Sequence, residues 1–185
     1  MTDRELLLAF VERRDADSLG VLLERHQDSL LRFVSKLVGD PHAAQDVVQE
    51  TFLEAARHPR RLLAVESCQN WLLRVARNRS VDWLRKESRR RRHTAAAAPR
   101  SESTSEEAGP AAASERTERC AAMRAAIDAL PPRQKEVLLL RIEADKSYRE
   151  IAEITGFSPT NVGYILHRTL KDLSAKLSPR EGRKP

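Results

Sequence analysis

The chain has 185 residues, enough for one domain or two small ones, and a net charge of +6 from 33 Lys plus Arg against 27 Asp plus Glu. Its two cysteines stand far apart and outside any CxxC pattern, which excludes a disulfide framework and indicates a reducing compartment. No stretch approaches the roughly 20 apolar residues that span a bilayer, and the charged N-terminus is unlike a signal peptide. We therefore expect a cytoplasmic protein without membrane insertion.

Helical periodicity dominates the first part of the chain. Thr2 and Glu5 have the spacing of a capping box, which predicts a short helix through about Arg13. Residues 19–37 then place apolar side chains at intervals of three and four, which is typical of one buried helix face. His26 stands on that face and is interpreted as a core residue rather than a metal ligand.

Two further helices are predicted before residue 93. Gly39 ends the long helix and Asp40 caps the next one, which continues to about residue 55. A loop is expected from about residue 58 to residue 69, followed by a helix that ends in a basic run. The cations of this run are Arg85, Lys86, Arg89, Arg90, Arg91 and Arg92. Its two interpretations are a solvated helix end and a contact with a polyanion.

The composition changes over residues 93–114, which are rich in Ala, Ser, Glu and Pro and lack a large apolar side chain. Such a stretch cannot bury enough surface to offset its ordering entropy, so we predict a flexible linker here. The predicted fold class is all-α, with two small helical domains at 1–92 and 115–178 and a basic tail at 179–185.

The second domain contains the most informative segment, SYREIAEITGFSPTNVGYILHR, over residues 147–168. Ser147 begins a second capping box, Gly156 suits a left-handed turn residue, and Ser158 caps the helix that follows. This order predicts a helix-turn-helix, whose second helix enters the major groove of DNA. Short polar side chains at Thr160 and Asn161 can reach base edges. The motif alone fits a repressor, a response-regulator output domain or a sigma factor.

Three segments resemble sigma factors of the sigma-70 family. Residues 40–55, DPHAAQDVVQETFLEA, resemble the family's most characteristic segment, and residues 71–85, WLLRVARNRSVDWLR, resemble its next one. Residues 129–141, ALPPRQKEVLLLR, together with the helix-turn-helix resemble its C-terminal promoter-reading domain. The absence of extra domains resembles the extracytoplasmic-function (ECF) subfamily, and the resemblance covers roughly residues 19–175.

The resemblance implies a function and a role for each surface. The chain is expected to bind core RNA polymerase and to direct promoter-specific transcription initiation, with an anti-sigma factor as a further partner. The residues implied to dock on the polymerase clamp are Asp46, Gln49, Glu50 and Phe52. Those implied to melt and read the single-stranded -10 element are Arg74, Arg77, Asn78, Arg79, Arg85 and Lys86. Those implied to read the -35 duplex are Ser158, Thr160, Asn161, Tyr164, His167, Arg168 and Lys171.

Two details qualify the resemblance. The family usually carries arginine where Ile165 and Leu170 stand, which predicts fewer phosphate contacts on this recognition helix. Trp71 and Trp83 have two interpretations, as stacking platforms for bases or as core residues, and their helical spacing favours the core.

Other classes of function find less support in the residues. The five histidines are scattered, and HExxH, phosphate-binding glycine loops and a nucleophile elbow are absent. We therefore expect no catalytic site, no metal and no cofactor. The alternative is a free-standing helix-turn-helix repressor or activator, which binds duplex DNA without polymerase and usually as a symmetric dimer.

Overall fold

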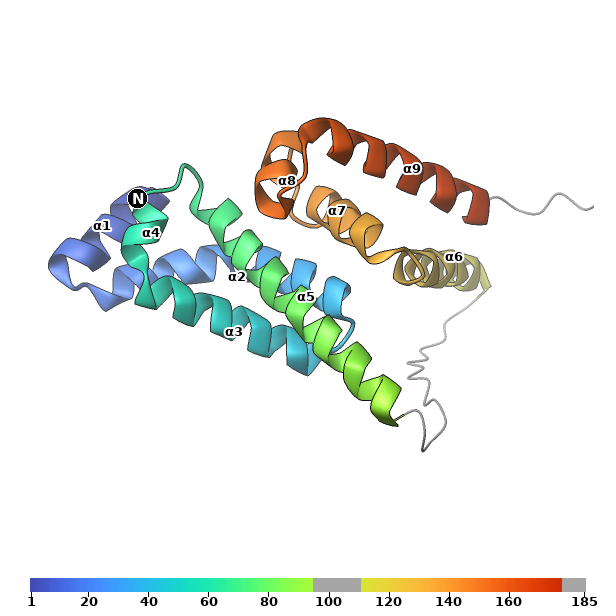
Figure 1. The fold of residues 1–185 in the computed structure, drawn as a ribbon, viewed down its shortest axis with the longest axis horizontal. Helices are drawn as coiled ribbons and strands as arrows, with labels where there is room; N and C mark the ends of the chain where they lie inside the picture. Colours follow the sequence, from blue (N-terminus) through green and yellow to red (C-terminus); the bar gives the residue numbers. More distant parts are fainter. Residues whose placement is uncertain (95–110, 178–185) are drawn as a thin grey trace, which may run out of the picture.

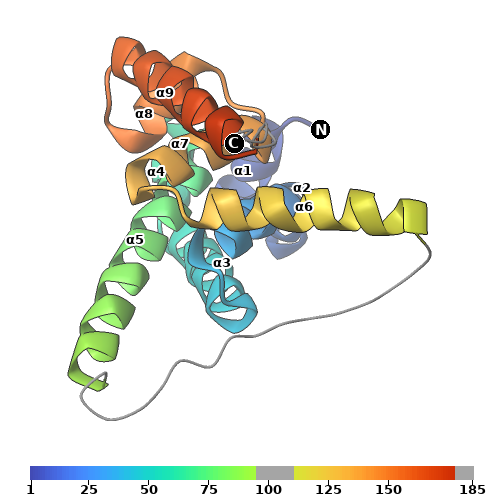
Figure 2. The ribbon, with the colours of Figure 1, turned by 90° about the vertical axis from the view of Figure 1, so that its right-hand side faces the viewer.

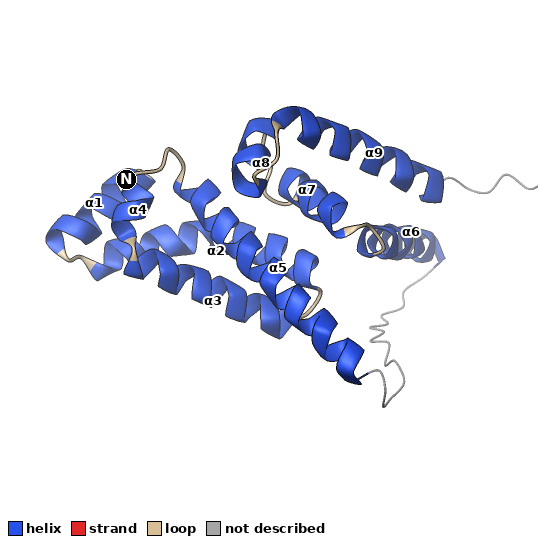
Figure 3. Cartoon of the chain, in the orientation of Figure 1, coloured by secondary structure: helices blue, strands red, loops and turns tan. Residues whose placement is uncertain are grey.

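The part of the chain that the structure describes is built from helices alone (Figure 3). The computed structural model describes residues 1–94 and 111–177. The predicted all-α class with two helical domains is confirmed. In chain order the helices are α1 (Asp3–Arg13), α2 (Ala16–Val38), α3 (Pro41–Arg57), α4 (Pro59–Leu63), α5 (Cys68–Thr94), α6 (Ala111–Asp128), α7 (Pro132–Ile142), α8 (Tyr148–Thr155) and α9 (Pro159–Leu177).

The predicted helix ends of the first domain are present. The N–H of Glu5 donates to Thr2 Oγ1 at 3.3 Å and the N–H of Thr2 donates to Glu5 Oε2 at 2.7 Å, so α1 begins with a capping box. Helix α2 ends at Gly39, whose φ of 76° lies in the left-handed region that glycine adopts without strain. Asp40 Oδ1 accepts from the N–H of Ala43 at 2.9 Å and begins α3.

The core of the first domain lies where α2 meets α3 and α5 (Figure 1). Leu22, Leu30 and Phe33 of α2 are fully buried there, and each such side chain contributes about 1.5–3 kcal/mol relative to an exposed one. Trp71 and Trp83 are half-buried and pack against the same core. Their positions fit the core interpretation better than that of exposed stacking platforms.

Two segments differ from the sequence-based expectation. The expected loop after residue 58 contains α4, where Pro59 occupies a first-turn position and Leu62 is buried. Helix α5 runs to Thr94 and α6 begins at Ala111, so both ends of the predicted 93–114 linker are helical. Glu87 pairs with cations one turn later in α5, and Ala-rich sequence favours helix at the start of α6. Residues 95–110 and the predicted tail, 179–185, lie outside the described residues.

The second domain packs α7, α8 and α9 together, and its buried residues belong to one hydrophobic cluster with those of the first domain. Val137, Leu139, Ile151 and Val162 are fully buried there. Gly156, with φ of 80°, ends α8 and turns the chain into α9. Helix α6 contacts α9 and extends beyond the rest of the domain (Figure 2). The predicted order of capping box, left-handed turn and second helix is therefore the order observed.

The two domains lie directly against each other. Helix α8 contacts α5, and α7 contacts α2. In Figure 1 the second domain lies along the first, with α9 on the side away from α2 and α3. This arrangement leaves the second helix of the helix-turn-helix on the surface and places α7 and α8 at the contact between domains.

Candidate nucleic-acid interfaces

Helix α9 presents a polar face to solvent. Ser158 Oγ accepts from the N–H of Asn161 at 3.2 Å, so the predicted cap of this helix is present. Val162 and Leu166 are buried on the opposite side and fix the helix on its domain. All seven predicted -35 residues are exposed, namely Ser158, Thr160, Asn161, Tyr164, His167, Arg168 and Lys171. The geometry therefore brings them together on one accessible helix.

The capping box at the start of α8 is charge-assisted. The N–H of Ser147 donates to Glu150 Oε2 at 2.9 Å, and Lys146 Nζ donates to Glu150 Oε1 at 3.1 Å. These contacts, first of all the one with the Ser147 backbone, lower the pKa of Glu150 from 4.5 to about 2. An ionised carboxylate is thus held at the positive end of the helix that supports α9.

Arg77, a predicted -10 residue, lies at the contact between the domains. Its guanidinium donates from Nε to Glu136 Oε2 at 2.9 Å and from Nη2 to Glu136 Oε1 at 3.0 Å. Glu136 belongs to α7 and is only 3% exposed. Arg77 Nη1 also donates to Asn78 Oδ1 at 3.1 Å. The structure therefore ties this part of α5 to the second domain.

Arg79, another predicted -10 residue, is held within the first domain. It donates to Glu50 Oε2 at 2.6 Å and to Glu54 Oε2 at 3.5 Å, both on α3. Glu50 is one of the residues predicted to contact polymerase, so the two predicted sets meet where α3 crosses α5. Asp46 and Gln49 are exposed on α3, while Phe52 is half-buried against the core.

Both domains match known families. Residues 22–90 match the family model described as Sigma-70 region 2, and residues 120–173 match the one described as Sigma-70, region 4. The chain belongs to the sigma-70 family. The first match covers most of α2 to α5, and the second runs from within α6 into α9.

Two relatives match over most of both chains. RNA polymerase sigma factor YlaC of Bacillus subtilis strain 168 is 25% identical over 162 residues, which are 88% of this chain and 93% of that protein. ECF RNA polymerase sigma factor SigX of the same strain is 24% identical over 159 residues, covering 85% and 82% of the two chains. The protein is an ECF sigma factor, which directs promoter-specific transcription initiation.

Solved structures show the same fold. CnrH, determined in complex with the cytosolic domain of CnrY, matches with a TM-score of 0.67 and 23% identity, over 95% of this chain and 96% of that one. RpoE, determined in complex with the anti-sigma factor NepR from Bartonella quintana, matches with a TM-score of 0.68 and 20% identity, over 85% and 95%. Within the described residues, no helix of this sigma factor is long and apolar enough to cross a membrane.

A cationic cleft of about 1040 Å³ separates the far half of α5 from the second domain of this sigma factor. The predicted -10 residues Arg85 and Lys86 line its α5 side, and Arg133 and Phe157 line the other side. Clustered cations around a partly apolar cleft concentrate the electrostatic field that attracts a polyanion. Arg74 and Asn78 are exposed on α5 but lie outside this lining.

Further polar contacts close the two domains of the sigma factor on each other near the start of α5. Lys146 Nζ donates to Gln69 Oε1 at 2.6 Å, and Asn70 Nδ2 donates to Glu153 Oε2 at 3.3 Å. Asn70 Oδ1 is buried and has no hydrogen-bond partner among the described residues. Gln69 and Asn70 lie at the start of α5, the helix that carries the predicted -10 residues, so these contacts tie the beginning of that helix to the second domain.

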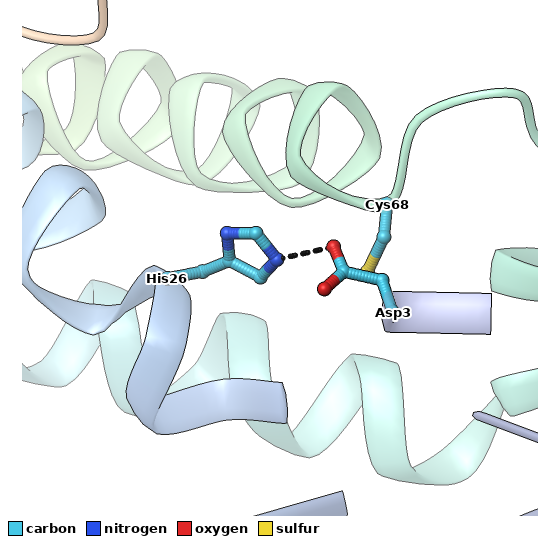
Figure 4. A group of neighbouring side chains, drawn as sticks. All are labelled: Asp3, His26 and Cys68. Atoms are coloured by element: carbon cyan, nitrogen blue, oxygen red, sulfur yellow. Dashed lines mark hydrogen bonds and ion pairs between the residues drawn. The ribbon is translucent and has the colours of Figure 1, made fainter. Parts of the chain in front are cut away.

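One side-chain cluster was missed by the sequence reasoning. Asp3 of α1, His26 of α2 and Cys68 at the start of α5 converge in the first domain (Figure 4). His26 is buried, and its Nε2 lies 2.7 Å from Asp3 Oδ2, within hydrogen-bond distance. The three residues come from three separate helices, so no local spacing pattern reveals them.

Proposed function

We propose that this sigma factor docks on core polymerase through the exposed face of α3, opens and reads the -10 element with α5, and reads the -35 element with α9. The observation that carries the proposal is that six predicted -35 residues are exposed on α9 and the seventh, Ser158, caps its start, in the second domain, whereas α3 and α5 belong to the first. The polymerase supplies the chemistry, so the chain acts without a catalytic site of its own. Because RNA polymerase and promoter DNA lie in the bacterial cytoplasm, we expect the sigma factor to act there.

The -35 role rests on the chemistry that α9 exposes. Asn161 lies in the first turn, where a recognition helix approaches base edges, and its amide can both donate and accept hydrogen bonds. Arg168 and Lys171 lie farther along the helix and suit phosphates. Leu170 is 57% exposed where the family usually carries arginine, which supports a smaller phosphate footprint.

The -10 role requires the two domains to separate. A guanidinium that holds both oxygens of Glu136 has too few free N–H groups to hold phosphate or a base in the same way. Asn78 is exposed but its carbonyl oxygen is engaged by Arg77. We therefore expect the closed arrangement to be the form without DNA, and promoter binding to break the pair between Arg77 and Glu136.

An anti-sigma factor is proposed as a second partner. Two structural neighbours were determined as complexes, RpoE with the anti-sigma factor NepR and CnrH with the cytosolic domain of CnrY. In this chain the closed arrangement already ties one predicted -10 residue to the second domain, so a partner that binds both domains at once can hold the promoter contacts out of use. Capture of a dedicated protein by the tagged chain from unstressed cells is the expected result.

Reconstitution with core polymerase tests the proposed function. The purified chain is mixed with bacterial core enzyme, passed over a sizing column and assayed for runoff transcription on a genomic promoter library. We expect co-elution and promoter-specific transcripts. A double variant with Asp46→Ala and Gln49→Ala should lose co-elution, while Gln45→Ala, an exposed neighbour on α3, should retain it.

The alternative of a free-standing repressor predicts a different result. In that case the wild-type chain stays apart from polymerase and binds duplex DNA tightly by itself. That outcome contradicts the proposed function, and no observation of the described residues favours it over a sigma factor.

A further inference from the structure

The cluster of Asp3, His26 and Cys68 has the composition of a metal site. One possible ligand atom from each residue lies within 4.8 Å of the other two. His26 and Cys68 are each only 7% exposed, and Asp3 is more accessible. Figure 4 shows the imidazole and the carboxylate pointing toward each other with the sulfur close by. Three different ligand types are thus held by three packed helices.

The thiol of Cys68 lacks a partner. It is free of a disulfide, it is more than nine-tenths buried, and no hydrogen bond joins it to a described residue. Burial, with a smaller effect from the charge of Asp3, raises the pKa of this thiol to about 12. A cation bound between the sulfur and the carboxylate would favour the thiolate over the neutral thiol, because a thiol that coordinates a metal gives up its proton.

We infer that Asp3, His26 and Cys68 bind one Zn²⁺ ion, with a fourth position open to water. Zn²⁺ prefers four ligands in a tetrahedron and accepts thiolate, imidazole and carboxylate together. Its usual bond lengths place such ligand atoms about 3.4–3.6 Å apart. The pair His26 Nε2 and Asp3 Oδ2, now 2.7 Å apart, must widen by about 0.7 Å, while the sulfur moves closer.

The surroundings complete the site. Arg25 Nη1 donates to Asp3 Oδ1 at 2.6 Å and leaves Oδ2 for the ion. Hydrogen bonds of this kind orient the ligands in many zinc sites. Arg25 Nη2 also donates to the carbonyl oxygen of Met1 at 3.0 Å and holds the chain start in place. A carboxylate and a thiolate balance the charge of Zn²⁺. The Asp3 side chain is 28% exposed, which gives water a route to the fourth position.

The ion links the site to promoter reading. It joins α1 and α2 to the first residue of α5, directly beside Gln69 and Asn70 of the domain contact. Bound Zn²⁺ is expected to fix the segment before α5 in one position. This consequence rests on the proposed function of α5, whereas the metal site itself rests on the cluster alone.

Cobalt spectroscopy tests the site directly. The full chain is treated with a chelator, freed of it and titrated with Co²⁺, whose thiolate complexes absorb in the near ultraviolet. We expect a thiolate-to-cobalt band that saturates at one equivalent and disappears when Zn²⁺ is added, because thiolate ligands favour Zn²⁺. The variant Cys68→Ser should lose the band. The variant Cys120→Ser, which removes the exposed cysteine, should keep it.

Thermal unfolding and a second variant cover the case in which Cys68→Ser folds poorly. Zn²⁺ should raise Tm of the wild type and of Cys120→Ser but not of Cys68→Ser, since a ligand stabilises only the state that binds it. His26→Gln keeps a hydrogen-bond donor for Asp3 and should weaken Co²⁺ binding at least tenfold. A band that persists in Cys68→Ser and His26→Gln, or no band in the wild type, overturns the site. Neither result bears on transcription, so the sigma factor assignment is tested separately.

Discussion

The two helices proposed to contact DNA, α5 and α9, differ in what surrounds their cations. On α9, Arg168 and Lys171 are exposed, and no ion pair joins them to a side chain within 1–93 or 117–177. On α5, Arg77 and Arg79 are engaged by acids from α7 and α3. The proposed -35 surface on α9 is thus exposed already, whereas two cations of the proposed -10 surface on α5 are engaged by other parts of the molecule.

The ion pairs of exposed and buried residues also differ in how much free energy they contribute. Exposed cations keep their water and gain little from pairing, with typical values of about 0–1 kcal/mol. Glu136 has lost its water and depends on Arg77, so removal of either partner is expected to be costly. We therefore expect the proposed -35 contacts to depend on local structure, and the proposed -10 contacts to depend on a competition between protein and DNA.

Loss of support beneath α9 gives the largest expected effect. Leu166→Ala should lower the free energy of unfolding of the second domain by about 2–5 kcal/mol, because it opens a cavity under a buried side chain. Leu170→Ala, on the exposed side of the same helix, should change it by less than about 0.5 kcal/mol. Urea unfolding of both variants checks this. Equal losses would show that α9 is not anchored as described.

Release of Arg77 tests the competition on α5. Glu136→Gln should weaken the contact between domains by about 3 kcal/mol, because the guanidinium loses a buried charge partner. We expect a larger radius of gyration by small-angle scattering and tighter binding of a single-stranded -10 oligonucleotide. Glu143→Gln is the matched control, since its partner Lys36 is 56% exposed and the pair contributes little. Unchanged DNA affinity in Glu136→Gln would show that the pair between Arg77 and Glu136 does not compete with DNA binding.

Base reading by α9 should respond to single substitutions without a change in fold. Asn161→Ala should weaken binding of the holoenzyme to its -35 duplex by about 1–3 kcal/mol and relax preference at one position. Lys171→Ala should weaken all sequences alike and reduce the slope of affinity against salt. Competition binding across single-base variants of the promoter separates the two cases. The same loss on every sequence for both variants contradicts the assigned roles.

The smallest effect concerns the cap of α8. Ser147→Ala should lower stability by about 1 kcal/mol at neutral pH. The lowered pKa of Glu150 means that its carboxylate stabilises the fold above about pH 4.5 and that this contribution is lost as the pH falls toward 2. Glu150→Gln, which has no carboxylate to protonate, should therefore lose less stability than the wild type between pH 7 and pH 3. Thr2→Ala, which removes the corresponding cap of α1, should leave unfolding of the second domain unchanged.

Local signals in the sequence were enough for most of the fold. Asp40, Gly156 and Ser158 predict helix ends because their chemistry acts within one turn, and each is found in that role. Helix α4 escaped prediction because it has five residues and no side-chain cap. Short helices of this kind depend on tertiary packing, here the burial of Leu62.

The contacts between residues far apart along the chain were invisible in the sequence. Arg77 and Glu136 are 59 residues apart, and nothing in the spacing indicates that an expected DNA contact is paired with the other domain. Asp3 and His26, separated by 23 residues, meet only because α1 folds across α2. The exposure of the residues proposed for -35 reading could be predicted because they lie along one amphipathic helix, whereas the pairing of Arg77 and Arg79 follows from packing.

Helix α5 connects these two kinds of site mechanically. It is continuous over 27 residues, from Cys68 to Thr94, and at 1.5 Å per residue it is about 40 Å long. Its first residue belongs to the Asp3, His26 and Cys68 cluster, and its far half carries the basic run. A rigid rod of this length acts as a lever, so a tilt of about 10° at its beginning displaces the far end by about 7 Å. That displacement is twice the distance between adjacent base pairs, so a small rearrangement around one buried thiol can shift where the basic run meets the DNA backbone.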